Sequence, residues 1–305
     1  DDVTVTETVF YLSSGAVGVV LNFVVLYIAS RYIDMEDKPR QIIVVNMTMA
    51  DFLFCLVYVS TRPFLSLFPI WSCRAYYITI WTCQLCSCVN LLWLNLDKLI
   101  FIQWPLHYYQ VVNRRRMIWL SIVTWTALIT MAVVVDSFMI VQGDCIKVHL
   151  AASAYLPILV VYVLLIVLSF ACSAVIYCIA QTSTRMEPIA RTQMLRRLLF
   201  LFSSTLWTFF TCLPYRILYL TASIAPIHRF SFFETYVNTT HACFKLLVVG
   251  IVINPIITVA TQFIYRNRVL IFCRKTKRSS HSEFDSVVSA RKTSSKPFLE
   301  TIPLN

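Results

Sequence analysis

The chain has 305 residues, of which 58% are hydrophobic and 13% are charged, and its formal net charge is +11. Soluble domains carry about 25% charged and about 45–50% apolar residues, so this composition excludes an ordinary water-soluble protein. The cations flank apolar segments instead of forming a basic face of their own. This placement favours attraction to anionic membrane lipid over binding to nucleic acid.

The apolar residues gather into long uncharged stretches. A helix needs about 20 such residues to cross a bilayer, and most of the stretches reach or approach that length. The two that flank Asp51 form one span interrupted by a single carboxylate. We therefore predict an all-α bundle of seven transmembrane helices, with no sign of the short alternating strands of a β-barrel. The stretches are 8–30, 41–50 with 52–61, 75–96, 117–135, 150–184, 198–215 and 246–265.

Basic residues concentrate in alternate loops and in the C-terminal segment. The positive-inside rule then places the C-terminus in the cytoplasm, and an odd number of spans leaves the N-terminus outside. We expect a membrane domain over 1–274, with 1–8 extracellular, and a disordered cytoplasmic tail over 275–305. The residues assigned to the inside are Arg31, Lys38, Arg40, Arg114, Arg115, Arg116, Arg185, Arg191, Arg196, Arg197, Arg266, Arg268, Arg274, Lys275, Lys277 and Arg278.

Most of the eleven cysteines lie inside spans, where they serve as small apolar packing residues. Cys73 and Cys145 fall on the extracellular side, which is oxidising, so we expect them to form a disulfide bridge. A short amphipathic cytoplasmic helix follows the seventh span. Cys273 comes directly after it, where palmitoylation and a plain free thiol both remain open.

Charges inside hydrocarbon are costly and require a partner or a function. Asp51 stands alone in the second span. Pro157, Pro214 and Pro255 interrupt the fifth, sixth and seventh spans, and proline weakens a helix by removing a backbone hydrogen bond. This combination indicates a bundle that changes shape, although prolines are also common in membrane helices.

Several motifs, in order along residues 10–275, resemble those of the rhodopsin-like (class A) G-protein-coupled receptors. The spacing of each motif from the next is also compatible with that family. The matching positions are Asn22 in the first span, Asn46 to Asp51 in the second, Cys73 and Asp97-Lys98-Leu99 at the two ends of the third, Pro105 after it, Trp125 in the fourth, Pro157 in the fifth, Cys212-Leu213-Pro214-Tyr215 in the sixth and Asn254-Pro255 in the seventh.

Four positions depart from the family pattern. Lys98 replaces an arginine and loses its planar fork of donors. Cys212 stands where the family has a tryptophan, and Thr258 replaces a tyrosine. By spacing from Pro157, Leu165 takes the usual tyrosine position of the fifth span. These changes weaken the case for efficient ligand-triggered switching.

The resemblance implies a plasma-membrane receptor, not an enzyme, that binds an extracellular ligand and activates heterotrimeric G proteins by outward movement of the sixth span. It implies a cluster of Asp51 with Asn22, Ser87 and Asn254, where a sodium ion held by Asp51 and Ser87 and an ion-free water network remain equally open. Asp97, Lys98, Leu99, Pro105, Arg196 and Arg197 would form the G-protein side. Serines of the tail, such as Ser279, Ser280 and Ser282, would serve a receptor kinase and arrestin.

The ligand is harder to predict. Ile80 occupies the position of the aspartate of amine receptors, and Val248 that of the lysine of opsins, so both ligand classes are disfavoured. The outer half holds Arg62, Arg216, His241 and Lys245. Our hypothesis is that Arg216 and Lys245 receive an anionic group, and pairing with Asp136 or Glu234 is the competing interpretation.

A peptide is the favoured ligand and a small anionic molecule the second choice, because an aromatic mouth suits a large partner. That mouth is formed by Phe64, Phe68, Trp71, Tyr76 and Tyr77, and Tyr215 is a further candidate ligand-binding residue. Two alternatives remain for the whole chain. One is a receptor-like protein with atypical, weak or constitutive signalling, and the other is a transporter, which the lack of internal repeats disfavours.

Overall fold

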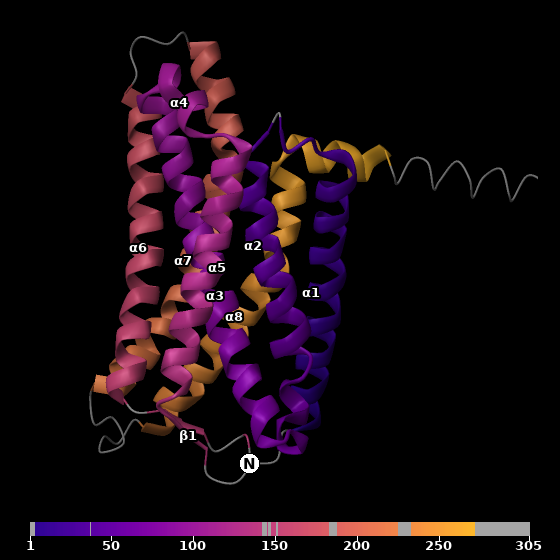
Figure 1. Cartoon of the computed structure of the whole chain (residues 1–305), viewed down its shortest axis with the longest axis vertical. Coiled ribbons are helices and arrows are strands. Elements are labelled where there is room, and N and C mark those ends of the chain that lie inside the picture. Colours follow the sequence, from indigo (N-terminus) through magenta and orange to yellow (C-terminus); the bar gives the residue numbers. More distant parts are fainter. Residues whose placement is uncertain are drawn as a thin grey trace, which may run out of the picture.

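A computed structural model describes residues 4–36, 38–141, 145, 148–150, 152–182, 188–224 and 233–271. Figure 1 shows long helices that run side by side, with the start of the chain at one end of the bundle. The helices are α1 (Val5–Tyr32), α2 (Gln41–Leu53), α3 (Ile70–Gln103), α4 (Pro105–Val111), α5 (Arg114–Asp136), α6 (Ala152–Thr182), α7 (Pro188–Ile224) and α8 (Phe233–Thr261). Two short segments, η1 (Phe54–Val59, a π-helix) and η2 (Arg62–Leu67, a 3₁₀-helix), continue α2.

The helices confirm the predicted all-α membrane bundle. Within the described residues, six helical segments are long and apolar enough to cross a membrane, counting α2 with η1 as one. The seventh rod is α7, which contains the uncharged stretch 198–215 between more polar ends. Large apolar side chains such as Phe23, Val123 and Phe210 are exposed on the outside of the bundle, as expected for a surface in contact with lipid. The chain is therefore a multi-pass membrane protein.

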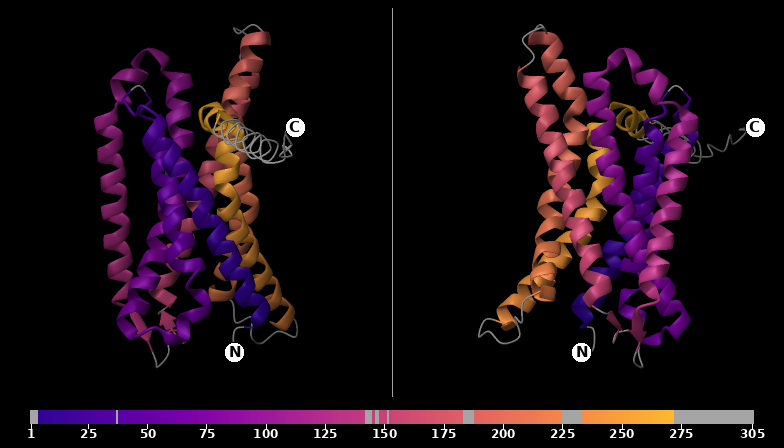
Figure 2. Two further views of the ribbon diagram at one scale, coloured as in Figure 1. Left: turned by 90° about the vertical axis from the view of Figure 1, so that its right-hand side faces the viewer. Right: turned by 60° about the vertical axis from the view of Figure 1, so that its left-hand side comes forward.

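Several helices extend beyond the predicted spans. α1 begins at Val5, inside the segment 1–8, because the Thr4 hydroxyl caps it by accepting a hydrogen bond from the backbone N–H of Glu7. α7 reaches back to Pro188. Together α6 and α7 project past the other helices at the end opposite the N-terminus, as Figure 2 shows.

The two ends of the bundle differ. At one end, β1 (Met139–Val141) and β2 (Val148–Leu150) form an antiparallel pair beside the start of α3, and we call this the disulfide end. At the other, α4 joins α3 to α5, and we call this the α4 end. Residues 263–271 form a further helix that lies across the bundle there, which agrees with the predicted short helix after the last span.

Two apolar clusters fill the interior, one toward each end. Between them lies a layer of buried polar side chains that includes Asn22, Asn46, Asp51, Asn90 and Asn254. Lipid tails are as apolar as the helix faces, so hydrogen bonds and close packing, rather than burial of apolar surface, hold such helices together. Asn46 illustrates this, because it donates to Asn90 of α3 at 3.0 Å and accepts from the Trp125 indole of α5.

Close packing is most evident between α7 and α8. A Cβ added at Gly250 of α8 would lie 2.5 Å from the Thr211 hydroxyl of α7. The indole N–H of Trp207 donates to the Gly250 carbonyl at 2.8 Å. Glycine at this position is therefore required by the short distance between the two helices.

Candidate functional site

The disulfide end is braced by a covalent bond. Cys73, in the first turn of α3, is bonded to Cys145, which lies between β1 and β2, and their Cα atoms are 5.6 Å apart. This confirms the predicted bridge. The Tyr77 hydroxyl donates to the Cys145 carbonyl at 3.4 Å, so the β-hairpin is fixed across the end of α3.

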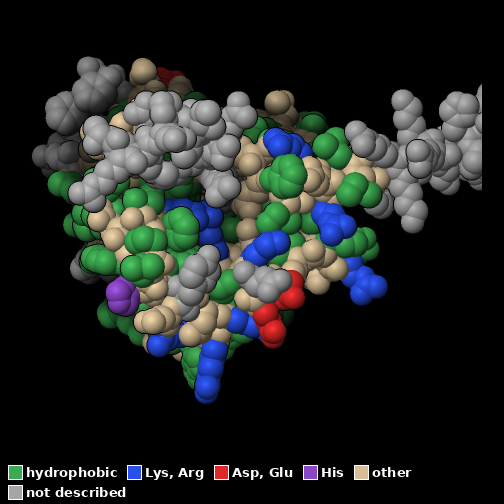
Figure 3. All heavy atoms as spheres, turned by 90° about the horizontal axis from the view of Figure 1, so that it is seen from above, with side chains coloured by type: hydrophobic (Ala, Val, Ile, Leu, Met, Phe, Trp, Pro, Cys, Tyr) green, Lys and Arg blue, Asp and Glu red, His purple; other side chains and the backbone are tan. Residues whose placement is uncertain are grey.

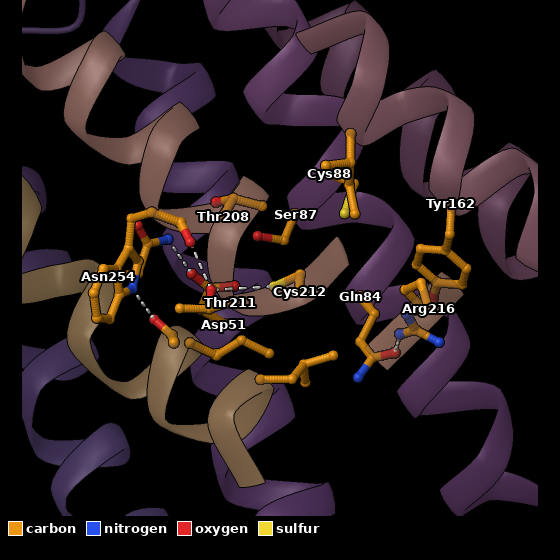
Figure 4. A pocket seen from close by; sticks show the side chains of 15 residues that line it. Asp51, Gln84, Ser87, Cys88, Tyr162, Thr208, Thr211, Cys212, Arg216 and Asn254 are labelled. Atoms are coloured by element: carbon orange, nitrogen blue, oxygen red, sulfur yellow. Dashed lines mark hydrogen bonds between the residues drawn. The ribbon is translucent and has the colours of Figure 1, made fainter. Parts of the chain in front are cut away.

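A cavity of about 40 Å³, lined by both polar and apolar side chains, lies inside the bundle between α2, α3, α6, α7 and α8. A buried water needs roughly 10–15 Å³ by the same measure, so the cavity has room for a few waters. Figure 4 shows Asp51 and Asn254 on one side of it and Gln84, Tyr162 and Arg216 on the other. Five elements therefore converge on one small space.

Asp51 holds the side of the cavity toward α8. The Asn254 side-chain amide donates to its carboxylate at 2.7 Å, and Ser87 also bonds to it. The hydroxyls of Thr208 and Thr211 line the same space. Hard cations prefer oxygen donors of this kind, so the donor set fits a sodium ion.

The predicted cluster is not complete, because Asn22 does not bond to Asp51 directly. Its amide donates instead to the Gly18 carbonyl at 2.9 Å, and its Oδ1 atom is buried without a partner among the described residues. Pro255 follows Asn254 inside α8. The structure thus brings together three of the four predicted residues, Asp51, Ser87 and Asn254.

Arg216 occupies the opposite side of the cavity. It is only 6% exposed, its guanidinium donates to Gln84 of α3, and it lies 4.0 Å from the centre of the Tyr162 ring of α6. Cys212, one turn away on α7, and Cys88 of α3 line the space between Arg216 and Asp51. Pro214 lies between Cys212 and Arg216 inside the continuous helix α7.

Arg216 and Lys245 do not share a site. Lys245 forms a salt bridge of 3.2 Å with Glu7 of α1, whereas Arg216 faces α3 and α6. The competing interpretation, in which Asp136 or Glu234 pairs with these cations, also fails for Asp136, whose salt-bridge partner is Arg74 at 3.5 Å. Sequence reasoning missed the Lys245–Glu7 pair because Glu7 was assigned to the extracellular segment and not to a helix beside α8.

Arg62 forms a second cationic centre, separate from the cavity. Its guanidinium lies 5.1, 5.5 and 4.7 Å from the ring centres of Tyr11, Tyr58 and Phe244, and it donates to the Tyr58 hydroxyl at 2.6 Å. Cation–π contact stabilises such a group where no carboxylate is near. Arg62 therefore joins η2 to α1 and α8.

The remaining predicted ligand residues surround these two centres. Tyr76 and Ile80 are buried in the apolar cluster of the disulfide end, and Tyr77 packs against Tyr76. Tyr215 contacts Phe244 at a centroid distance of 5.1 Å. His241 lines a shallower hollow between α7 and α8, together with Tyr219, Phe233 and Tyr236.

At the α4 end, Asp97 is 5% exposed and has partners from α4, from α3 and from the residue before α2. The Tyr108 hydroxyl of α4 donates to it at 2.7 Å, Arg40 lies 3.4 Å away and Lys98 lies 4.0 Å away. Burial lowers the pKa of Arg40, and the Asp97 carboxylate opposes that shift. Sequence reasoning had placed Arg40 only in a loop, so its role as the nearest cation to Asp97 was missed.

Leu99 and Pro105, also predicted for the G-protein side, lie at the same end of the bundle. Leu99 packs into the apolar cluster of this end, and Pro105 is the first residue of α4. Arg196 and Arg197 fall within α7, but their side chains lie outside the described part of the structure. Seen from this end, Lys and Arg side chains are spread over the surface with few acidic ones (Figure 3).

A curated protein of known class matches this chain closely. The G-protein coupled receptor aex-2 of Caenorhabditis elegans is 52% identical over 298 residues, which cover 97% of this chain and 92% of that protein. No family model matches the chain. Identity at this level over nearly the full length establishes common ancestry and class. The chain belongs to the G-protein-coupled receptors.

One departure noted in the sequence, at Leu165, looks different in the folded receptor. Pro157 is only the sixth residue of α6, about 13 Å before Ile166 of the cavity at 1.5 Å per residue. Leu165 therefore lies in the middle of the receptor, and a tyrosine does occur nearer the α4 end of α6. This is Tyr177, whose ring lies 5.7 Å from that of Phe202 of α7.

Several side chains of the receptor's interior were not predicted, among them Gln84, Tyr162, Trp207 and Arg40. The first three line the cavity. A signal existed for Trp207, which lies five residues before Cys212, where the family tryptophan is missing. The predicted palmitoylation site at Cys273 and the tail serines lie outside the described residues.

Proposed function

We propose that this receptor binds an extracellular peptide at its disulfide end and activates heterotrimeric G proteins at its α4 end through outward movement of α7. The N-terminus is extracellular and the C-terminus cytoplasmic in this proposal. The described start of α1 and the end of α8 lie at opposite ends of the bundle, and the basic surface lies at the α4 end, which the positive-inside rule assigns to the cytoplasm.

The position of Arg216 carries the proposal. This residue of α7 reaches the cavity between Gln84 of α3 and Tyr162 of α6, and Pro214 lies two residues before it in the same helix. A ligand that binds Arg216 more tightly in one position of α7 than in another would shift the equilibrium between those two positions of the helix. The free energy of binding would then move the helix.

A peptide is the favoured ligand because aromatic side chains crowd the disulfide end. Tyr76 contacts both Tyr77 and Phe68 there, and Trp71 at the start of α3 is 72% exposed. Aromatic residues are enriched where proteins contact large partners. An acidic group of the peptide would be received by Arg216, and a small anionic molecule could use the same side chain.

The test is a cell-based second-messenger assay with a panel of peptides and acidic metabolites. With the agonist so identified, Arg216→Ala should lower potency at least tenfold, because a buried guanidinium is replaced by an uncharged group. The matched control is Arg74→Ala, since Arg74 is half exposed and pairs with Asp136. Equal potency for Arg216→Ala and the unsubstituted receptor would remove Arg216 from the ligand site.

The proposal extends to the cytoplasmic tail. Phosphorylation of its serines by a receptor kinase would add negative charge for arrestin, and a lipid chain on Cys273 would hold the start of the tail at the membrane. Replacing Ser279, Ser280 and Ser282 by alanine should reduce agonist-dependent recruitment of arrestin while leaving G-protein activation in place.

A further inference from the structure

The facing sides of α3 and α7 share one register. Gln84 of α3 is bonded to Arg216 of α7, and Asn95 of α3 is bonded to Thr205 of α7. Eleven residues separate the two positions on each helix, which is about three turns at 3.6 residues per turn. Both hydrogen bonds therefore lie on the same face of each helix.

Between these two hydrogen bonds, the facing side chains of α3 and α7 form successive layers, and we call this contact the seam. Cys88 and Cys212, one turn from Gln84 and Arg216, line the cavity in the same register. Beyond Asn95 and Thr205, Leu99 and Leu201 belong to the apolar cluster of the α4 end. The Asn95–Thr205 bond thus stands between the cavity and the apolar packing that α7 must leave if it moves outward.

Asn95 and Thr205 are fully enclosed, with exposed fractions of 0% and 1%. The Asn95 amide nitrogen donates to the Thr205 hydroxyl at 3.2 Å and to the Leu91 carbonyl of its own helix at 2.9 Å. Its Oδ1 atom is buried without a partner among the described residues. Leaving a buried polar group without a partner is costly, and water entering an open cleft would satisfy it.

The described side chains of α7, which do not include those of residues 188–197, 199 and 200, form no charge pair with α3. α7 contains no aspartate or glutamate, and among the described residues no salt bridge joins the two helices. Asp97, the carboxylate at the end of α3, has cationic partners before α2 and on α3 itself. At the α4 end, the described hydrogen bond that links α3 to α7 is therefore Asn95–Thr205.

We propose that the Asn95–Thr205 hydrogen bond is the restraint that holds α7 against α3 in the resting receptor. The bond favours the closed seam, whereas the unpartnered oxygen of Asn95 favours a hydrated, open one. Removing only the Thr205 hydroxyl leaves one N–H of the Asn95 amide without its partner in the closed state, while the other still donates to the Leu91 carbonyl. This loss shifts the balance toward opening. Removing both polar groups favours the closed state again, because no buried polar atom in that layer then gains a hydrogen bond to water on opening. This inference rests on the proposed outward movement of α7.

The test compares basal G-protein activation for four receptors at equal surface expression: unsubstituted, Thr205→Val, Thr205→Ser and Asn95→Leu/Thr205→Val. Thr205→Val is expected to raise basal heterotrimer dissociation roughly fivefold, which corresponds to about 1 kcal/mol. Thr205→Ser retains the hydroxyl and should lie close to the unsubstituted receptor. The double variant should return to or fall below its level. Thr221→Val, at the other end of α7, controls for the loss of a threonine hydroxyl as such.

A second measurement separates this inference from the proposed function. Hydrogen exchange of the purified receptor should be faster over residues 198–206 of α7 in Thr205→Val and slower again in the double variant, whether or not any G protein responds. Unchanged exchange in Thr205→Val, or a double variant as active as the single one, would overturn the restraint. Absence of G-protein activation in every receptor, with the predicted exchange pattern, would instead contradict the proposed function.

Discussion

Asp97 is a buried carboxylate, and among the described side chains its nearest cation is Arg40, a residue from a different part of the chain. The guanidinium of Arg40 is closer to Asp97 than the ammonium group of Lys98 is, and the Tyr108 hydroxyl adds a hydrogen bond. Removing the better partner of a buried ion pair leaves an uncompensated charge, at a cost of about 3–5 kcal/mol. Arg40→Met should therefore lower the melting temperature of the purified receptor more than Lys98→Met does. An equal or larger loss for Lys98→Met would show that Lys98 is the main partner.

Asp51 is the residue that we expect to bind a sodium ion. The carboxylate and the Ser87 hydroxyl supply oxygen donors in a cavity with room for a small cation. A ligand that binds only the folded receptor at ten times its Kd stabilises it by about 1.4 kcal/mol. We expect the melting temperature to rise when sodium replaces choline at constant ionic strength, and Asp51→Asn to abolish that rise. A sodium effect that survives in Asp51→Asn would favour a network of water alone.

At the scale of elements, the α7–α8 contact depends on a single missing side chain. Gly250→Ala would place a Cβ 2.5 Å from the Thr211 hydroxyl and 2.7 Å from its Cβ. Overpacking of this kind costs about 1–3 kcal/mol, and it would also disturb the hydrogen bond from Trp207 to the Gly250 carbonyl. We expect a lower melting temperature and lower surface expression. Thr239→Ala, at an exposed position of the same helix, is the matched control and should change little. If both variants unfolded alike, the close approach at Gly250 would not limit stability.

The helices themselves were largely predictable, because lipid imposes long uncharged stretches and these are visible in the sequence. Their ends were not. α1 starts earlier than the apolar run because of the Thr4 cap, and α7 extends through a basic segment that hydropathy alone leaves out. The salt bridges between different helices were also not predictable. Glu7 with Lys245 and Arg40 with Asp97 join residues far apart in the chain, and their pairing depends on helix rotation, which charge patterns do not specify.

The candidate site was predicted only in part, because contacts between helices depend on their relative depth in the bundle. Asp51, Ser87 and Asn254 were grouped by resemblance to a family, and the structure places them around one cavity. Gln84 and Tyr162 were not predicted, because neither residue type stands out in an apolar span. Only the depth of α6 relative to α3 and α7 brings them beside Arg216.

At the scale of the whole molecule, the bundle links two dissimilar ends through one polar interior. The disulfide end carries the β-hairpin, the aromatic residues and the cation Arg62, and the α4 end carries Asp97 with its partners and a mostly basic surface. α7 contributes to the cavity and to the α4 end, and it projects beyond α3 there. A displacement of α7 is therefore the simplest way for ligand binding at the disulfide end to change the surface at the α4 end.

Nucleotide exchange tests this account most directly. The purified receptor in lipid nanodiscs would be mixed with each class of purified heterotrimeric G protein, and the rate of GTP-analogue uptake would be measured. We predict faster uptake with at least one class than in empty nanodiscs, and a further increase for Thr205→Val. If the folded receptor accelerates uptake by none of them, with or without that substitution and in the presence of an agonist, the proposed coupling through α7 is contradicted.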